Sequence, residues 1–257
     1  MTKPTPQFLV EYNGYILPGY AQGETIDNSI QVTDYTAPYS YDPLSENTGE
    51  SPKNITIPML VWDEDYASCR EQIQLAATYL KSKRGDYGKL YVGRNDRYYQ
   101  VIPISIKYDK TATDSFRTSK YEITFKAKAY LEADALTSLN ISGTGTFSTD
   151  NATTLRTYAN GISSPCYITI SGAANTPTIS GYTSAGEYCG YLAASGVSGT
   201  TITINSSDYT AVDSEGNNQN PLLTTPDYAL FVGVGKTYFS CAGVSTATIS
   251  WHDRWAL

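Results

Sequence analysis

The chain has 257 residues, and its 18 Lys and Arg against 25 Asp and Glu give a formal charge of −7. This acidic balance without a basic cluster is poorly suited to a phosphate backbone, so direct nucleic-acid binding is not expected. The sequence has no apolar run of membrane-spanning length, and residues 1–6 lack the apolar core of a signal peptide. We therefore expect that the chain does not insert into a membrane and that it assembles in the cytosol.

The first quarter of the chain predicts short strands and a loop. Residues 8–32 predict a strand pair that turns at Asn13-Gly14, because this dipeptide adopts the tight turns of β-hairpins. Residues 33–53 are rich in turn formers and tyrosine and show little periodicity, which predicts a long loop. After residue 54, Ile55, Ile57 and Met59 alternate with polar residues, as in a strand with one buried face.

An amphipathic α-helix is predicted over residues 66–83. Asp63-Glu64-Asp65 places negative charge at its start, where free N–H groups and the helix dipole favour it. Basic residues close the last turn, and Gly85 is the expected left-handed cap. The apolar positions of the helix are spaced by threes and fours and form one stripe, made of Tyr66, Cys69, Ile73, Ala76, Ala77 and Leu80.

After the helix the chain is predicted to be almost entirely strand and turn. Strands are expected at 89–92, 98–108 and 119–131, the last with the cleanest alternation of buried and wet positions. Residues 133–164 are small and polar and predict a connector with one or two weak strands. We place a domain boundary near residue 135, giving domains 1–135 and 136–257. Short strands typical of a β-sandwich or jelly roll follow at 167–170, 176–180, 188–192, 201–204, 229–232, 237–241 and 247–251.

The sequence carries no signature of an active site, so we expect no enzyme, no catalytic residue and no cofactor. The single histidine, His252, follows Trp251, which is predicted to be buried with Ile249; His252 is then expected on the solvent face in a structural or surface role. Gly235-Lys236-Thr237 resembles the end of a phosphate-binding loop. However, Leu230 stands where the first glycine of that loop belongs, and strands follow instead of a helix.

Metal binding is not expected either. Asp63-Glu64-Asp65 and Asp213-Ser214-Glu215-Gly216 lack the alternating ligands and the closing glutamate of a calcium loop, so helix capping and an exposed turn explain them. The cysteines are widely spaced and form no CxxC, which favours small buried side chains at Cys69, Cys166, Cys189 and Cys241. A Cys166–Cys189 or a Cys189–Cys241 disulfide is the alternative.

Tyrosine is the most distinctive residue type, with 23 copies against 6 Phe and 3 Trp. It suits half-exposed strands, because the ring packs while the hydroxyl stays in water. Three tyrosines of a Gly- and Ser-rich segment are candidate sugar contacts, since aromatic rings on a β-sandwich can stack on sugar rings; they are Tyr182, Tyr188 and Tyr191. Ordinary packing on a strand face is the alternative interpretation.

Several segments, in order and spacing, resemble the distal tail protein (Dit) family of long-tailed siphophages. NITIPMLVW leads into the helix CREQIQLAATYL, and GDYGKLYVGRNDRYYQVIPISIKY then follows with the spacing L-x-V-x-x-x-x-x-Y-x-x-V. TSKYEITFKAKAYLEA ends the first domain. The second domain opens with YANGISSPCYITISGAANTPTIS and closes with TISWHDRWAL.

The resemblance implies a mainly β fold. Its N-terminal β-sandwich domain would carry one α-helix and a β-hairpin or belt loop, and its C-terminal domain would be a galectin-like or jelly-roll β-sandwich. It also implies a structural virion protein of a phage tail, assembled in the cytoplasm of the bacterial host. Six copies would form a ring that joins the tail tube to the tail tip or baseplate. The partners would be further copies, the tube protein and the tip or hub protein, with receptor-binding proteins and host glycans left open.

The tyrosine-rich segment of the first domain is expected to make contacts between copies, because it lacks core periodicity. The candidate residues are Tyr35, Tyr39 and Tyr41. Two alternative functions stay open. One is a carbohydrate-binding β-sandwich module for adhesion to the host surface. The other is a different tail component such as a tube subunit, which would polymerise instead of closing into a ring.

Overall fold

The computed structural model describes residues 9–26, 30–35, 44–50, 53–83, 85–93, 96–108, 117–148, 163–172, 176–195, 201–224, 230–233 and 235–256, without the side chains of 30–35, 44–50, 129 and 256. The chain divides into two compact units, Met1–Glu132 and Ala133–Ala256. Each unit has its own hydrophobic core. Within the described ranges, no helix is long and apolar enough to cross a membrane.

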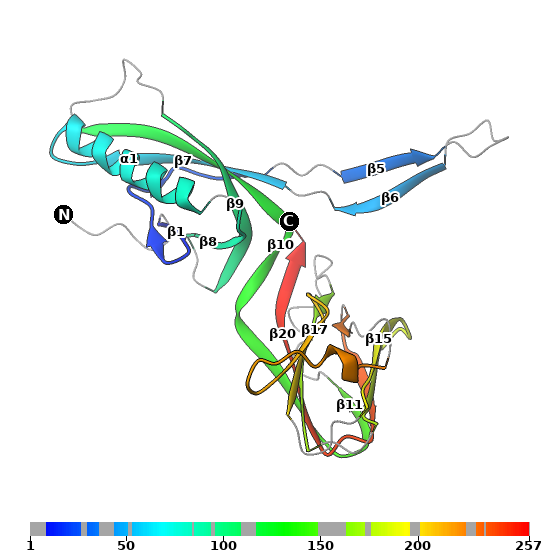
Figure 1. Cartoon of the computed structure of the whole chain (residues 1–257). Helices are drawn as coiled ribbons and strands as arrows, with labels where there is room; N and C mark the ends of the chain where they lie inside the picture. The colour runs from blue at the N-terminus through cyan, green and yellow to red at the C-terminus, as the bar shows by residue number, and fades with distance from the viewer. Residues whose placement is uncertain are drawn as a thin grey trace. The chain divides into compact units, whose positions relative to one another are not determined.

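The first unit is built on a hydrogen-bonded sheet (Figure 1). Its strand order is β2 (Tyr15–Ile16), β1 (Val10–Tyr12), β8 (Gly88–Val92), β9 (Arg97–Lys107), β10 (Thr118–Ser142) and β7 (Lys53–Trp62), and the short strands β3 (Tyr20–Ala21) and β4 (Thr25–Ile26) also pair with β7. β7 and β10 run antiparallel from the pair Trp62–Thr118 to the pair Lys53–Ala127. Along β7 every second side chain is buried, so the alternation predicted for this strand is confirmed.

The helix of the first unit, α1 (Tyr66–Ser82), forms where the apolar spacing predicts it. Its N-cap is Asp65, whose Oδ1 accepts a hydrogen bond from the Ser68 backbone N–H at 2.8 Å. The C-cap is Lys83 and not Gly85, which was the predicted cap. Gly85 lies two residues further along and has a left-handed φ of 105°. The helix packs into the core of the sheet through Cys69, Ile73, Ala76 and Leu80.

Two predictions for the N-terminal segment have different outcomes. The hairpin turn at Asn13-Gly14 is confirmed, with φ of 49° and 80° between the paired residues Tyr12 and Tyr15. The long loop predicted from composition over 33–53 is wrong, because β5 (Ile30–Tyr35) and β6 (Leu44–Glu50) pair as an antiparallel ribbon, in agreement with the β-hairpin that the family resemblance implied. A ribbon of this kind is held by backbone hydrogen bonds, which an alternating apolar pattern does not report.

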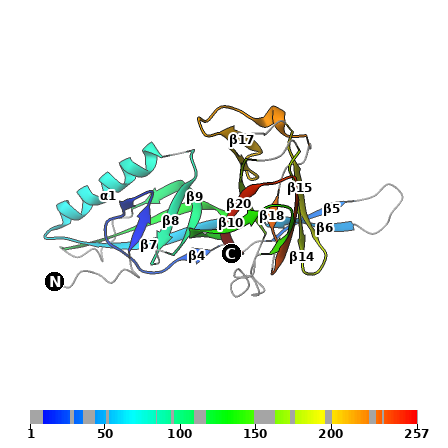
Figure 2. The ribbon, with the colours of Figure 1, turned by 90° about the horizontal axis from the view of Figure 1, so that it is seen from below.

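The second unit is a β-sandwich (Figure 2). One sheet has the order β17 (Thr210–Asp213), β16 (Ile202–Asn205), β13 (Tyr167–Ser171), β20 (Thr246–Ala256) and the final part of β10. The other has the order β11 (Gly145–Ser148), β19 (Thr237–Ala242), β14 (Thr178–Thr183) and β15 (Tyr188–Ala193). A short pair, β12 (Ser164–Pro165) with β18 (Phe231–Val232), and the 3-10 helix η2 (Asn220–Leu222) complete the unit.

The core of the second unit is formed by side chains of both sheets. Ile168 and Trp251 of the first sheet and Ile179 and Phe239 of the second are fully buried in one cluster. The predicted fold class, mainly β with one helix in the N-terminal part and a β-sandwich after it, is confirmed for the described residues. β10 and β20 are longer than predicted, and β17 was not predicted at all.

Candidate interaction surfaces

The single histidine of the chain is held in structural contacts. His252 is half-buried, its Nδ1 lies 2.9 Å from the Ala133 carbonyl oxygen, and its ring meets the Tyr167 ring edge-on at 6.3 Å. His252 alternates with the buried Trp251 and Asp253, as predicted for a residue on the solvent face, but its ring is only partly exposed. The partial burial arises because β10 continues beyond its predicted end and places the Ala133 carbonyl beside β20.

The two acidic segments organise the local backbone. Asp65 caps α1, and its hydrogen bond from Ser68 lowers the pKa of its carboxyl group. Asp213 accepts hydrogen bonds from the side chain and backbone of Asn217, from the Glu215 N–H and from Gln219, and these bonds lower its pKa. Among the described residues, no group of three His, Cys, Asp or Glu side chains is arranged to hold a metal ion.

The cysteines behave as small buried side chains, as predicted. All four are free and buried. Burial raises the pKa of the thiols of Cys69 and Cys189, and it raises that of Cys241 to about 11. A raised pKa disfavours the reactive thiolate, so these side chains contribute packing and not nucleophiles.

A buried polar network occupies the end of the first unit. Glu132 is buried, and its Oε1 accepts hydrogen bonds from the hydroxyl of Tyr98 and, at 3.2 Å, from Nε2 of Gln100. The Lys89 ammonium lies 4.3 Å from the centre of the Tyr98 ring. Burial, followed by the Glu132 hydrogen bond, raises the pKa of Tyr98, so its hydroxyl remains a donor. This network has the donors that a buried carboxylate needs and is a structural feature.

One flank of α1 carries a surface pocket lined by exposed apolar side chains. This Trp62 pocket, about 410 Å³, is lined by Ile16, Pro18, Tyr20, Trp62, Gln72 and Leu75 among others. Ile16, Trp62 and Leu75 are 56%, 42% and 59% exposed. Large apolar side chains gathered at one exposed place mark contact surfaces, because leaving them in water is unfavourable.

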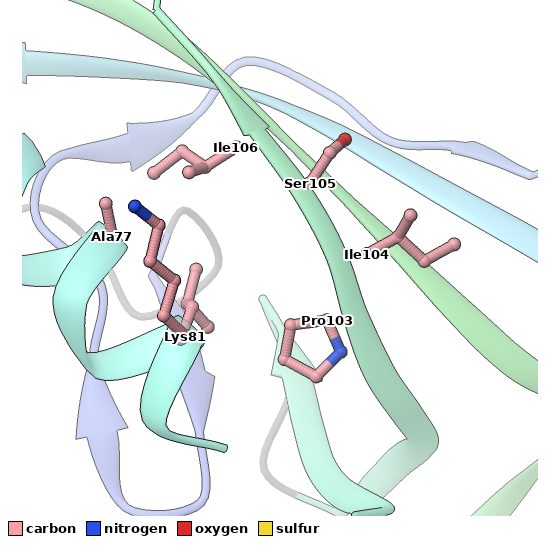
Figure 3. A pocket seen from close by; sticks show the side chains of 7 residues that line it. Ala77, Lys81, Pro103, Ile104, Ser105 and Ile106 are labelled. Carbon is pink, nitrogen blue, oxygen red and sulfur yellow. The ribbon is translucent and has the colours of Figure 1, made fainter. Parts of the chain in front are cut away.

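The other flank of α1 carries a second, smaller pocket against β9 (Figure 3). This Ile104 pocket, about 220 Å³, lies between Ala77, Leu80 and Lys81 of the helix and residues 103–106 of the strand. Figure 3 shows Ala77 and Lys81 on the side of the helix that faces β9. Its apolar lining with one ammonium group and one hydroxyl suits binding of a protein side chain and offers no acid–base pair for catalysis.

The outer face of the β11-β19-β14-β15 sheet carries a row of tyrosines. Cross-strand pairing places Tyr188 beside Tyr182, Tyr182 beside Tyr238, and Tyr238 beside Ser148. The rings of Tyr182 and Tyr188 lie 5.5 Å apart at 58°. The sheet therefore brings together two of the three predicted sugar contacts, and Tyr191 lies on the next row, opposite Ser180.

The remaining predicted site residues have a different outcome. Tyr35 lies in β5, where the side chain is not described, and Tyr39 and Tyr41 lie outside the described residues. Sequence reasoning missed Tyr238, although the alternation of the TYFSCA strand places its side chain on the exposed face, away from the face of the buried Phe239. It also missed Leu75, whose signal was an apolar residue off the buried stripe of the helix.

No protein-family model matches the chain, and no curated protein is significantly similar to it in sequence. Solved structures do match. The crystal structure of the Dit protein of SPP1, described as a paradigm of the hub adsorption apparatus in phages infecting Gram-positive bacteria, has a TM-score of 0.74 at 12% identity, covering 96% of this chain and 99% of that one. A chain of the phage p2 baseplate in its activated conformation with Sr has a TM-score of 0.51 at 12% identity, covering 91% and 89%. The fold of the distal tail protein, expected from the sequence motifs, is thus confirmed.

Proposed function

We propose that this protein is a structural component of a phage tail, a distal tail hub whose copies close into a hexameric ring between the tail tube and the tail tip or baseplate. The observation that carries the proposal is the agreement with SPP1 Dit over 96% of this chain and 99% of that one. A match of this extent includes both units, not a shared sandwich alone. The protein would act in the virion tail, after assembly in the bacterial cytoplasm, without catalysis and without a cofactor.

Ring closure needs two different surfaces on each copy, because a head-to-tail contact repeated by rotation is heterologous. The Trp62 pocket and the Ile104 pocket supply two such surfaces on opposite flanks of α1. Leu75 and Ile104 are exposed at these places, and a neighbouring copy would remove them from water. The pockets therefore support self-association of the first unit.

The β5–β6 ribbon is a second candidate contact. A two-stranded ribbon is marginally stable by itself, and its edges carry unpaired backbone groups that can pair with another chain. Pairing with a neighbouring copy would stabilise it and would place Tyr35, Tyr39 and Tyr41 between copies. The tube protein and the tip or hub protein would then contact the two faces of the ring. Receptor-binding proteins and host glycans are further candidate partners.

The test is the mass of the purified chain by light scattering, with negative-stain images of the same fraction. We expect closed rings of six times the monomer mass of 28.0 kDa. Open polymers would support the alternative of a tube subunit. A monomer at every concentration would contradict a self-closing ring.

A matched pair of helix variants links the assembly to the Trp62 pocket. Leu75→Glu places a charge in the pocket and is expected to dissociate the ring, because an unpaired charge in a contact is strongly unfavourable. Gln74→Glu makes the same charge at the neighbouring exposed position, outside both pockets. It should leave the mass unchanged. Equal effects of the two variants would exclude the pocket as a contact.

A further inference from the structure

The tyrosine row on the second unit has the geometry of a flat binding platform. Tyr182, Tyr188 and Tyr238 are 43%, 63% and 37% exposed, and they occupy three adjacent strands in direct register. Adjacent strands lie about 4.8 Å apart, so the three positions span roughly 10 Å. This length is comparable to two linked sugar rings.

The row beside the tyrosines consists of hydroxyl groups. Tyr191 pairs with Ser180, Ser180 pairs with Ser240, and Ser240 pairs with Thr146. Each of these side chains lies on the same face as the tyrosine row, because the residues between them, such as Ile179 and Phe239, point into the core. Rings that stack and hydroxyls that donate and accept hydrogen bonds thus lie side by side on one surface.

The face is also uncharged at its described paired positions. The two rows contain only tyrosine, serine and threonine side chains. Charged side chains beside them are the ammonium of Lys236, 5.3 Å from the centre of the Tyr238 ring, and the exposed Glu187, which precedes Tyr188 in the chain. An anionic polymer would need several cations here. A protein interface also uses tyrosine, but its centre is more apolar than this face, whose second row consists of hydroxyl groups. A neutral ligand rich in hydroxyl groups is the chemistry that this face complements.

We infer that the outer face of the β11-β19-β14-β15 sheet binds a neutral glycan, whose sugar rings stack on Tyr182, Tyr188 and Tyr238 while its hydroxyl groups bond to the Ser180–Ser240 row. The apolar faces of sugar rings pack on the tyrosine rings, and the neighbouring hydroxyls fix the orientation of the ligand. The inference does not depend on the proposed ring, since every residue in it belongs to the second unit.

The experiment uses the full chain and a panel of neutral tetrasaccharides of glucose, galactose and N-acetylglucosamine. Ligand-observed NMR is expected to detect millimolar binding of at least one member. Tyr182→Ala and Tyr188→Ala should each weaken that binding by about five- to tenfold, because each removes one stacked ring. The control is Tyr209→Ala, which removes a similarly exposed ring from a turn outside this sheet and should leave binding unchanged.

Four results would overturn the inference. The first is that no tetrasaccharide of the panel binds at millimolar concentration. The second is that Tyr182→Ala and Tyr188→Ala leave the affinity unchanged while unfolding at the wild-type temperature. The third is tighter binding of poly(glycerol phosphate), lost on adding salt, which would assign the face to an anionic polymer. The fourth is a change of mass in light scattering for Tyr188→Ala, which would make the face a contact between copies.

Discussion

Three buried tyrosines of the first unit contrast with the exposed tyrosine row of the second. In the first unit Tyr12, Tyr98 and Tyr121 are buried in or beside the core. In the second unit Tyr182 and Tyr188 lie on the outside of a sheet whose core is formed by isoleucine, phenylalanine and tryptophan side chains. The difference shows that tyrosine content alone does not indicate a surface. The partner of each hydroxyl group decides what the residue does.

Exposed apolar side chains other than tyrosine gather on the first unit. Ile16, Trp62 and Leu75 lie together there, and the proposed contact between copies would remove them from water. The tyrosine face of the second unit can stay in water, because its rings carry hydroxyl groups. The first unit therefore has the surfaces expected for assembly, and the second has a surface that is compatible with a free, hydrated state.

The largest expected effect contrasts a buried ring with an exposed one. Tyr121→Ala should lower the free energy of unfolding by about 3–5 kcal/mol, since it empties a core position and removes the hydrogen bond from Tyr121 to the Pro18 carbonyl at 2.7 Å. Tyr188→Ala should change it by less than about 0.5 kcal/mol. Chemical denaturation of both variants measures the difference. Comparable losses would refute the contrast between the units.

A smaller loss of stability is expected where a buried tyrosine donates a hydrogen bond to a carboxylate. Tyr98→Phe keeps the ring but removes one donor from Glu132, which should cost about 1–3 kcal/mol of unfolding free energy. The double variant Tyr98→Phe with Glu132→Gln should recover part of the loss, because a neutral amide is less costly to leave underbonded. A single variant as stable as the wild type would show that the remaining contacts of Glu132 suffice.

Tyr12→Phe is expected to change the free energy of unfolding in the opposite direction to Tyr98→Phe. Its hydroxyl is buried without a hydrogen-bond partner among the residues that the structure describes, while the Tyr12 and Phe125 ring centres lie 5.6 Å apart. Tyr12→Phe removes an unpaired polar group and keeps the packing, so the free energy of unfolding should stay equal or rise by up to about 1 kcal/mol. Thermal unfolding of Tyr12→Phe beside Tyr98→Phe makes the comparison. Destabilisation by Tyr12→Phe would contradict the unpaired state of the hydroxyl.

The sequence predicted those elements that a local pattern of residues specifies. The α1 stripe, the β7 alternation and the Asn13-Gly14 turn are local signals, and each was found where it was predicted. The β5–β6 ribbon was expected only from the family resemblance, because backbone pairing leaves no side-chain pattern.

The surfaces were partly predictable. Tyr182 and Tyr188 could be selected by composition, but their registration with Tyr238 depends on a residue 56 and 50 positions further along the chain. The Trp62 pocket joins residues of β2, β7 and α1, and no spacing rule connects positions so far apart in sequence. Such sites become visible when the strands are paired, since pairing is what brings the side chains together.

The last expected effect is an alkaline loss of stability in the first unit, which appears only above pH 10. Burial, with smaller contributions from Tyr79 and Asp86, raises the pKa of Tyr12 from 10.0 to about 12. A raised pKa in the folded state means that the stabilisation is complete below pH 10 and is lost as the pH rises towards 12, because the unfolded chain releases its proton first. Tyr12→Phe removes this titration, so its stability should fall less steeply than that of the wild type between pH 10 and pH 12. Denaturation curves at several pH values, with Tyr209→Phe as the exposed control, measure the two slopes. Parallel slopes for Tyr12→Phe and the wild type would mean that the Tyr12 hydroxyl reaches water in solution, and the contrast between buried and exposed tyrosines would then rest on Tyr98 and Tyr121.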